Sequence, residues 1–457
     1  MILKFKTAFA LTSLSLLIPV LSACGSDEDT SDSATYIQYY NGSPNSVATA
    51  LILDDYEYAR VNFADSLPRY SYTTGNSDLQ VTGVDELGED MILHELSVSL
   101  SDGDNHLYML VGDYDASELI DISYRREEMD ELNSDIDNDY SKMQVVVINA
   151  AMDTQTFDVY LGKEGEAITA ATLIDSLGYK AFSTEQMFDT GEYRLYLTAA
   201  GQTEVLFETS TLDLTTNTVY KLVIRNSFGP GEPKITIDNV DSTGTPIAFA
   251  NINANAEFRV FNGLSSLQAI DVTLTSPGAS INLTQLPVNT LSAFESIDFS
   301  DYGVSVTQTA DEQLLANNLL VTFNQDESKT LVIFDTQEGE TKGMTLTHDL
   351  RPSPFYHTVN FANLVDKYDR LDVYFVRSNE TIETAEYKLS YVEFTELVSI
   401  ELPSDDYDIS VVHSDSNGTL TLLYQSDAVS INKSGDYTML LTNDMTQPLG
   451  YRVTSFQ

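Results

Sequence analysis

The chain has 457 residues, 42% of them hydrophobic, and its 23 basic and 70 acidic side chains give a formal net charge of -47. A field of that sign repels nucleic acid and anionic lipid headgroups, so both are excluded as partners. The apolar content, with 20 Phe and 26 Tyr, suffices for several packed cores and excludes disorder for most of the chain.

Residues 1–23 have the pattern of a secretory signal peptide, because two lysines precede an apolar run that is too short for a spanning helix. The run ends in Leu21-Ser22-Ala23-Cys24, which resembles the lipobox of bacterial lipoproteins. The resemblance implies a diacylglycerol thioether at Cys24, cleavage after Ala23 and acylation of the new amino terminus. The alternative is an ordinary signal peptide with a chance or core cysteine. We therefore expect the lipid bilayer to be a partner through acylated Cys24.

Residues 24–34 are acidic and rich in serine, and they read as a flexible tether behind the lipidated cysteine. Gly25 and Ser26 follow Cys24, where resemblance to inner-membrane lipoproteins would require an aspartate, so the outer membrane is favoured. The mature chain could face the periplasm or the medium. Cys24 is the only cysteine, so the chain can form no internal disulfide.

One strand pattern recurs four times after the tether. An apolar strand ends in an asparagine, and a second apolar strand follows. The asparagines are Asn41, Asn149, Asn262 and Asn360, about 100 residues apart, which is the size of one small domain. Three copies place an aspartate in the second strand, at Asp158 and Asp271, nine residues after the asparagine, and at Asp372, twelve residues after it. We interpret all seven residues as structural markers of the repeat.

Short strand-like runs, frequent turn residues and few convincing helices predict an all-β chain, a tandem array of immunoglobulin-like antiparallel β-sandwich modules. The predicted order after the tether is module 1 at 35–124, an acidic linker at 125–141, module 2 at 142–240, a linker at 241–255, module 3 at 256–350 and module 4 at 351–457. Arg351-Pro-Ser-Pro354 begins the last module as a stiff joint, because each proline fixes its own backbone.

The acidic linker contains the only pattern that suggests a metal. Asp135, Asp137 and Asp139 alternate as in a calcium loop, but Tyr140 stands where that loop needs glycine and Val146 where it needs glutamate. The three aspartates therefore remain a weak candidate, and we predict no metal site. The acids are spread along the chain, which favours solubility over a dedicated cation surface and leaves weak divalent-cation binding as an alternative.

Motifs for catalysis are missing from the sequence. The five histidines are scattered without metal-ligand spacing, and there is no nucleophile elbow or phosphate-binding glycine loop. Neighbouring carboxylates occur by chance in a chain with 70 acids, and glycosidase chemistry needs a separation that sequence does not show. We therefore predict a protein that is not an enzyme and uses no cofactor.

The strand with Asn149, the run Phe157-Asp158-Val159-Tyr160, the strand at Gly191-Glu-Tyr193 and the closing strand at Gly435-Asp-Tyr437 resemble the bacterial family called domain of unknown function 4397. The similarity spans modules 2 to 4 and is fainter in module 1, which lacks the Asp-Val-Tyr triplet. It implies immunoglobulin-like sandwiches in tandem on exported or lipid-anchored proteins. It implies no activity and no catalytic residues.

These observations predict a non-enzymatic envelope lipoprotein that presents its modules for structural or protein-interaction and adhesion roles. The repeated modules would add reach from the membrane, and avidity if each binds weakly. The alternative is a carbohydrate-binding lipoprotein that supports nutrient capture, which clustered exposed Tyr or Phe would favour. The partner is thus an unknown protein or glycan.

Overall fold

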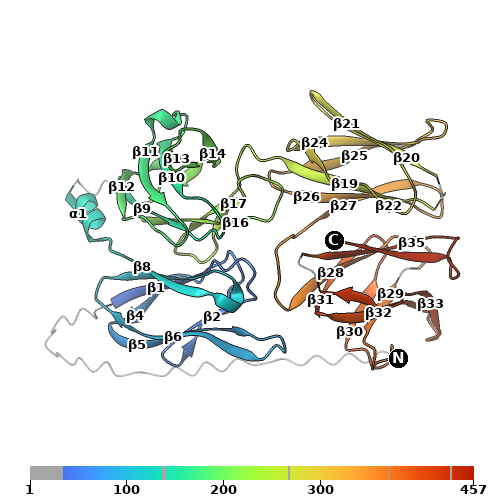
Figure 1. The fold of residues 1–457 in the computed structure, drawn as a ribbon, viewed down its shortest axis with the longest axis horizontal. Helices are drawn as coiled ribbons and strands as arrows, with labels where there is room; N and C mark the ends of the chain where they lie inside the picture. The colour runs from blue at the N-terminus through green and yellow to red at the C-terminus, as the bar shows by residue number, and fades with distance from the viewer. Residues whose placement is uncertain (1–33, 136–139, 266–267, 369, 433–434) are drawn as a thin grey trace, which may run out of the picture.

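The computed structural model describes residues 34–135, 140–265, 268–368, 370–432 and 435–457. Almost all regular structure in these ranges is β-strand, and the strands form four two-sheet sandwiches (Figure 1). The predicted all-β fold with tandem immunoglobulin-like sandwiches is confirmed. The signal peptide, Cys24 with its lipobox, and all of the predicted tether except Ala34 lie outside the described residues.

Module 1 has one sheet in the order β4-β1-β7-β8 and a second in the order β3-β2-β5-β6. We call the sheet that holds the first strand of a module its interface sheet, and the second sheet its outer sheet. The strands are β1 (Ala34–Asn41), β2 (Ala50–Leu53), β3 (Tyr56–Glu57), β4 (Tyr70–Thr73), β5 (Gly75–Val84), β6 (Asp90–Leu100), β7 (Asn105–Val111) and β8 (Glu118–Tyr124).

Module 2 repeats this plan with the interface sheet β12-β9-β16-β17-β18 and the outer sheet β11-β10-β13-β14, to which β15 is added. A 3₁₀ turn, η2 (Ile168–Ala170), precedes β11, and another, η1 (Tyr114–Ala116), precedes β8 in module 1. The strands are β9 (Lys142–Asn149), β10 (Phe157–Lys163), β11 (Thr172–Leu177), β12 (Gln186–Asp189), β13 (Gly191–Ala199), β14 (Val205–Glu208), β15 (Leu212–Leu214), β16 (Val219–Asn226), β17 (Ile235–Val240) and β18 (Ile247–Phe249).

Module 3 has the interface sheet β22-β19-β26-β27, with β23 beside β19, and the outer sheet β21-β20-β24-β25. Its first strand β19 runs parallel to β26, as β1 does to β7 and β9 to β16. The strands are β19 (Ala256–Gly263), β20 (Ile270–Ser276), β21 (Ala279–Leu286), β22 (Thr290–Leu291), β23 (Glu295–Ile297), β24 (Ser300–Gln308), β25 (Leu314–Phe323), β26 (Ser328–Asp335) and β27 (Thr341–Thr347).

Module 4 has the interface sheet β31-β28-β35-β36 and the outer sheet β30-β29-β32-β33, with β34 beside β32. Its first strand β28 again runs parallel to a late strand, β35. The strands are β28 (Tyr356–Asn363), β29 (Leu371–Val376), β30 (Tyr387–Val392), β31 (Leu397–Pro403), β32 (Asp405–Ser414), β33 (Leu420–Gln425), β34 (Val429–Ile431), β35 (Tyr437–Asn443) and β36 (Tyr451–Phe456).

The central strands of each interface sheet are buried on both faces. In β9, Val145 and Val147 pack into the core of module 2, while Val146 and Ile148 pack against module 1. Because successive side chains of a strand point to opposite faces, a continuous apolar run fills two cores at once. This explains the continuous apolar run in β9, whereas outer-sheet strands such as β21 and β24 alternate with exposed residues.

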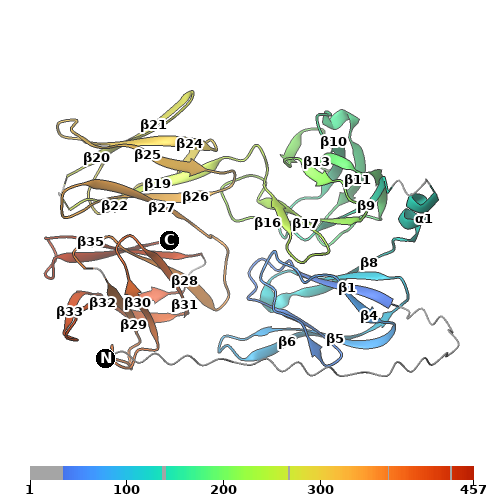
Figure 2. The same ribbon diagram turned by 180° about the vertical axis from the view of Figure 1, so that it is seen from behind.

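Modules 1 and 2 therefore pack interface sheet on interface sheet, and modules 3 and 4 do the same (Figures 1 and 2). The first interface buries Met109 of β7 against Val223 of β16, among others, and the second buries Phe261 of β19 near Leu440 of β35. The two pairs lie side by side as one block, with module 2 next to module 3 and module 1 next to module 4. The four modules are not arranged in a row. Because the second pair folds back beside the first, the molecule is shorter than the extended array that we expected.

Both predicted linkers contain regular structure. The acidic linker forms helix α1 (Glu127–Asp135), and its Met129 packs into the interface between modules 1 and 2. The linker at 241–255 contributes β18, which pairs with β17 and so extends module 2 beyond residue 240. The sequence suggests at most one helical turn in the acidic linker and no strand in the second linker, because their packing partners belong to a neighbouring module or strand. Within the described residues, no helix is apolar and long enough to cross a membrane.

Candidate binding cleft between modules 1 and 4

The repeat asparagines hold turns at the end of each first strand. Asn41, Asn149 and Asn262 have no exposed surface (0%). In each, Oδ1 accepts a hydrogen bond from the backbone N–H two residues further on, and Nδ2 donates to a backbone carbonyl of another loop or strand. Those carbonyls belong to Val61, Leu177 and Leu286, at 3.1, 3.2 and 3.0 Å. This geometry closes an Asx turn and satisfies buried backbone groups, so the role is structural.

The fourth marker is Asn363, and the expected Asn360 is wrong. Asn363 is fully buried, its Oδ1 accepts the backbone N–H of Val365 at 2.9 Å, and it ends β28 as Asn41 ends β1 and Asn149 ends β9. It also precedes Asp372 by nine residues, the spacing of the other two copies. Asn360 lies three residues earlier in the same strand, and its Nδ2 donates to a carboxylate oxygen of Asp436 at 3.3 Å. Two asparagines three residues apart made the register ambiguous.

The marker aspartates Asp158, Asp271 and Asp372 accept backbone N–H groups of neighbouring turns. The donors are Gly201, Gln285 and Tyr391, at 2.7, 2.7 and 3.1 Å. All three donors have a positive φ, and the last two lie at irregularities in the strand pairing. The aspartates therefore stabilise tight turns and bulges, a structural role of the kind we expected.

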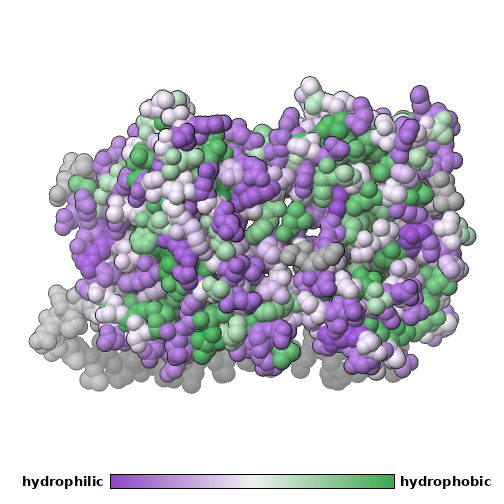
Figure 3. Space-filling model, in the orientation of Figure 1, coloured by the Kyte–Doolittle hydropathy of each residue, from purple (hydrophilic) through white to green (hydrophobic). Residues whose placement is uncertain are grey.

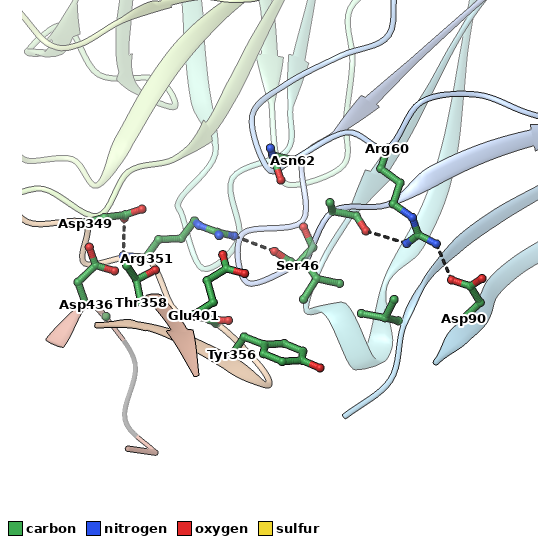
Figure 4. A pocket seen from close by; sticks show the side chains of 15 residues that line it. Ser46, Arg60, Asn62, Asp90, Asp349, Arg351, Tyr356, Thr358, Glu401 and Asp436 are labelled. Carbon is green, nitrogen blue, oxygen red and sulfur yellow. Dashed lines mark hydrogen bonds and ion pairs between the residues drawn. The ribbon is translucent and has the colours of Figure 1, made fainter. Parts of the chain in front are cut away.

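Two of the cavities of the molecule lie at the junction between modules 1 and 4. One cavity of about 480 Å³ opens between the loops of module 1 and the first strand of module 4 (Figure 4). Residues 349–356, which we call the module 3–4 joint, run along it. The lining side chains that Figure 4 labels are Ser46, Arg60, Asn62 and Asp90 from module 1, Asp349, Arg351 and Tyr356 from the joint, and Thr358, Glu401 and Asp436 from module 4.

Two arginines are held at the wall of this cavity. The Arg351 guanidinium donates to the Ser46 carbonyl at 2.8 Å and so connects the joint to module 1. Arg60 forms an ion pair with Asp90 at 2.6 Å. These contacts orient both guanidinium groups beside the cavity without neutralising Arg351, for which no carboxylate lies within ion-pair distance in the described residues.

Carboxylates of module 4 and the joint line the side of the cavity from which Arg351 extends (Figure 4). Burial, together with the nearby charge of Asp349, raises the pKa of Asp436 to about 6. The direction follows because a partly buried carboxyl beside a like charge favours its neutral form. Glu401 is exposed on β31 and faces the same space (Figure 4). The cavity thus mixes guanidinium groups and carboxylates on both of its sides, with Arg351 beside Glu401 and Asp436, and Arg60 beside Asp90 (Figure 4).

A second cavity of about 470 Å³ shares Tyr356 with the first. Its wall includes Arg377, which lies over the ring of Tyr387 at 4.9 Å and pairs with Glu386 at 2.9 Å. The Tyr356 hydroxyl reaches module 1, since a Cβ on Gly88 would lie only 2.9 Å from it. Tyr356 therefore stands between the two cavities and bridges the two modules.

Few of the residues singled out in the sequence reach this cleft. None of the marker asparagines and aspartates lines either cavity, whereas Arg351 and Pro354 of the predicted stiff joint do. The lining residues come from distant parts of the chain with no shared motif, so only the Pro-rich joint carried a signal. Asp135 ends α1, and Asp137 and Asp139 fall outside the described residues. Where the chain is described, no group of three or more His, Cys, Asp or Glu could hold a metal.

Residues 143–257 match the family model described as "Domain of unknown function (DUF4397)". The match covers module 2 and confirms the family resemblance there. No curated protein matches the chain.

Solved structures give distant similarities only. The TIE protein of Bacillus anthracis is 8% identical, with 88% of this chain and 68% of that chain covered and a TM-score of 0.16. BcpA, the major pilin subunit of Bacillus cereus, is 11% identical, with 66% and 99% covered and a TM-score of 0.14. Such scores do not support a shared function, so function is argued from the residues of this chain.

Proposed function

We propose that this chain, whose second module matches a family of unknown function, is a non-enzymatic envelope lipoprotein that presents a four-module block for structural or interaction and adhesion roles. Acylation of Cys24 anchors it to the outer membrane, and residues 25–33 separate the block from the lipid. The observation that carries the proposal is the use of interface sheets for module pairing, since buried faces of this kind make a stiff platform.

The surface left for partners is therefore made of loops, outer sheets and the cleft. Hydrophilic side chains are distributed over the face seen in Figure 3, and hydrophobic ones are interspersed with them. Exposed apolar residues on edge strands, such as Leu320 at 74% and Ile92 at 55%, offer places for contact by strand edges. A carbohydrate-binding role is the second candidate, favoured by Tyr356 and Phe355 at the cleft.

The anchor is tested by fractionating cells that express the wild-type chain or Cys24→Ala, with Ser26→Ala as the matched control. Wild type and Ser26→Ala are expected in the outer-membrane fraction and to incorporate labelled palmitate, and Cys24→Ala is expected to do neither. Membrane association that survives Cys24→Ala would contradict the lipid anchor. Protease treatment of intact cells, read by immunoblot of module 4, then shows whether the block faces the medium or the periplasm.

A further inference from the structure

We propose that the cleft between modules 1 and 4 binds a neutral oligosaccharide, with Tyr356 between two sugar units. The proposal rests on the function proposed above, because it assigns a ligand class to that binding block. The two cavities on either side of Tyr356 are the subsites, and the charged side chains of their walls bind the sugar hydroxyls.

The position of the cleft supports a ligand site. Small-molecule sites favour domain junctions and have volumes of about 300 to 1,000 Å³. Each cavity here, about 480 and 470 Å³, falls within that range. Its walls belong to two module pairs, each stiffened by its own apolar interface, so the subsites are held by rigid elements on both sides.

Tyr356 supplies an aromatic surface at the place where the cavities meet. Because Tyr356 lines both cavities, its side chain offers aromatic surface to each of them. Aromatic rings bury large apolar areas while their hydroxyl remains polar, which suits the C–H face of a sugar ring. Phe355 and Tyr387 add aromatic surface to the second cavity. Phe355 is itself fixed by an edge contact with Tyr114 of module 1, at 5.9 Å between ring centroids.

The polar groups suit hydroxyls better than ions. The first cavity places the Arg351 guanidinium beside Glu401 and Asp436, and Arg60 beside Asp90 (Figure 4). Guanidinium groups only donate hydrogen bonds and ionised carboxylates only accept them, and both have paired atoms in a fork. Adjacent hydroxyls of a sugar can accept from one and donate to the other. Because both signs occur on each side of the cavity, an anion or a cation would meet groups of its own sign wherever it bound.

The overall charge strengthens the choice of a neutral ligand. A net charge of -47 opposes the approach of an acidic polysaccharide. For a cation, the two arginines beside the cavity are repulsive, and part of the carboxylate charge is already used: Asp90 is paired with Arg60 and Glu386 with Arg377. A neutral ligand that forms hydrogen bonds with the charged side chains and contacts the aromatic rings fits both cavities.

The test uses the full chain purified in detergent micelles and titrated by calorimetry. The probes are neutral hexasaccharides (cellohexaose, xylohexaose, maltohexaose and mannohexaose), the acidic hexamer of galacturonic acid, the basic hexamer of glucosamine, and calcium chloride alone. The variants are Tyr356→Ala and Glu401→Gln, with Tyr391→Ala as the matched control, because Tyr391 is 68% exposed on module 4 and lines neither cavity. The melting temperature of each variant checks its folding.

We expect at least one neutral hexasaccharide to bind, with affinity reduced about tenfold by Tyr356→Ala, a loss of about 1.4 kcal/mol. Glu401→Gln should reduce it less, and Tyr391→Ala should leave it unchanged. Binding of none of the neutral probes, binding of the acidic, basic or calcium probe alone, or equal affinity in Tyr356→Ala overturns the proposal. These failures would leave Cys24-dependent anchoring intact, whereas a failed anchor would leave the titrations unaffected, so the two proposals fail separately.

Discussion

The molecule contains two kinds of junction between modules, and they differ in what fills them. Modules 1 and 2, like modules 3 and 4, meet through sheet faces whose apolar side chains are fully buried. Modules 1 and 4 meet through loops, the module 3–4 joint and polar side chains, and this junction is hollow. Apolar sheet faces stabilise a junction when their side chains are removed from water. Loops carry backbone N–H and C=O groups that need hydrogen-bond partners, which water or a ligand can supply. The first kind of junction thus holds the block together, and the second leaves room for a ligand.

The two apolar interfaces also differ from each other. Between modules 1 and 2, the Lys221 ammonium group is 2% exposed and donates to the Gln38 side chain at 3.0 Å. Between modules 3 and 4, Arg259 donates to the carbonyl of Gln457 at 2.6 Å and lies over the ring of Phe456 at 4.8 Å. The basic group in the first interface is thus bound by a neutral side-chain amide. The basic group in the second is bound by a backbone carbonyl and an aromatic ring.

The largest expected effect comes from placing a charge in an apolar interface. Val223→Asp and Leu440→Asp should each lower the free energy of unfolding by about 3 to 5 kcal/mol, because an unpaired charge is buried. Leu320→Asp, at a side chain that is 74% exposed, is the control and should change it by less than about 0.5 kcal/mol. Urea unfolding measures all three. Equal stability of Val223→Asp and the control would mean that modules 1 and 2 do not pack as described.

The next effect distinguishes the two apolar interfaces by pH. Burial, with the charges of Arg69 and Arg126, lowers the pKa of Lys221 from 10.5 to about 7. The unfolded chain then binds more protons between pH 7 and 10.5, so wild-type stability should rise with pH across that window.

Lys221→Met should remove this rise and stabilise the chain at pH 6 by about 2 to 4 kcal/mol, since the buried charge is gone. Urea midpoints at pH 6, 8 and 10 for wild type and variant test the expectation. Lys163→Met, on the exposed end of β10, is the matched control. A wild-type pH profile between pH 7 and 10 that Lys221→Met does not alter would contradict a buried, titrating ammonium group.

A smaller effect is expected at the hollow junction. Arg351→Ala removes the bond to the Ser46 carbonyl, and stability should fall by no more than about 1.5 kcal/mol, the net worth of one hydrogen bond. Hydrogen exchange should nevertheless accelerate in residues 349–356 while the amides of β16 and β35 keep their protection. Acceleration in β16 as well would mean that the junction and the apolar interfaces unfold together.

The smallest effect is electrostatic. The pKa of Asp436 is raised from 3.8 to about 6, so the folded chain binds more protons than the unfolded chain between those values, and this group lowers stability as pH rises through them. Asp436→Asn should raise stability at pH 7 by less than about 1 kcal/mol, because solvent screens a partly exposed group, and should have little effect at pH 3.5. Thermal melts at both pH values check this, with Asp406→Asn, an exposed carboxylate on β32, as control. A larger gain at pH 3.5 than at pH 7 would contradict the sign.

The sequence alone determined the fold class and the tandem arrangement of sandwich modules, because strand alternation, turn residues and the repeated asparagines are local signals. The apolar run Val145-Val146-Val147 likewise indicated a strand from sequence alone. The sequence could not say what covers the second face of this strand, since the residues that pack around Val146 belong to a different module, module 1. The register of Asn363 likewise depended on its pairing with β35, which local spacing does not contain. The cleft was decided by tertiary structure alone: Ser46, Arg351 and Asp436 are brought together only when two module pairs fold side by side, and no local pattern encodes that approach.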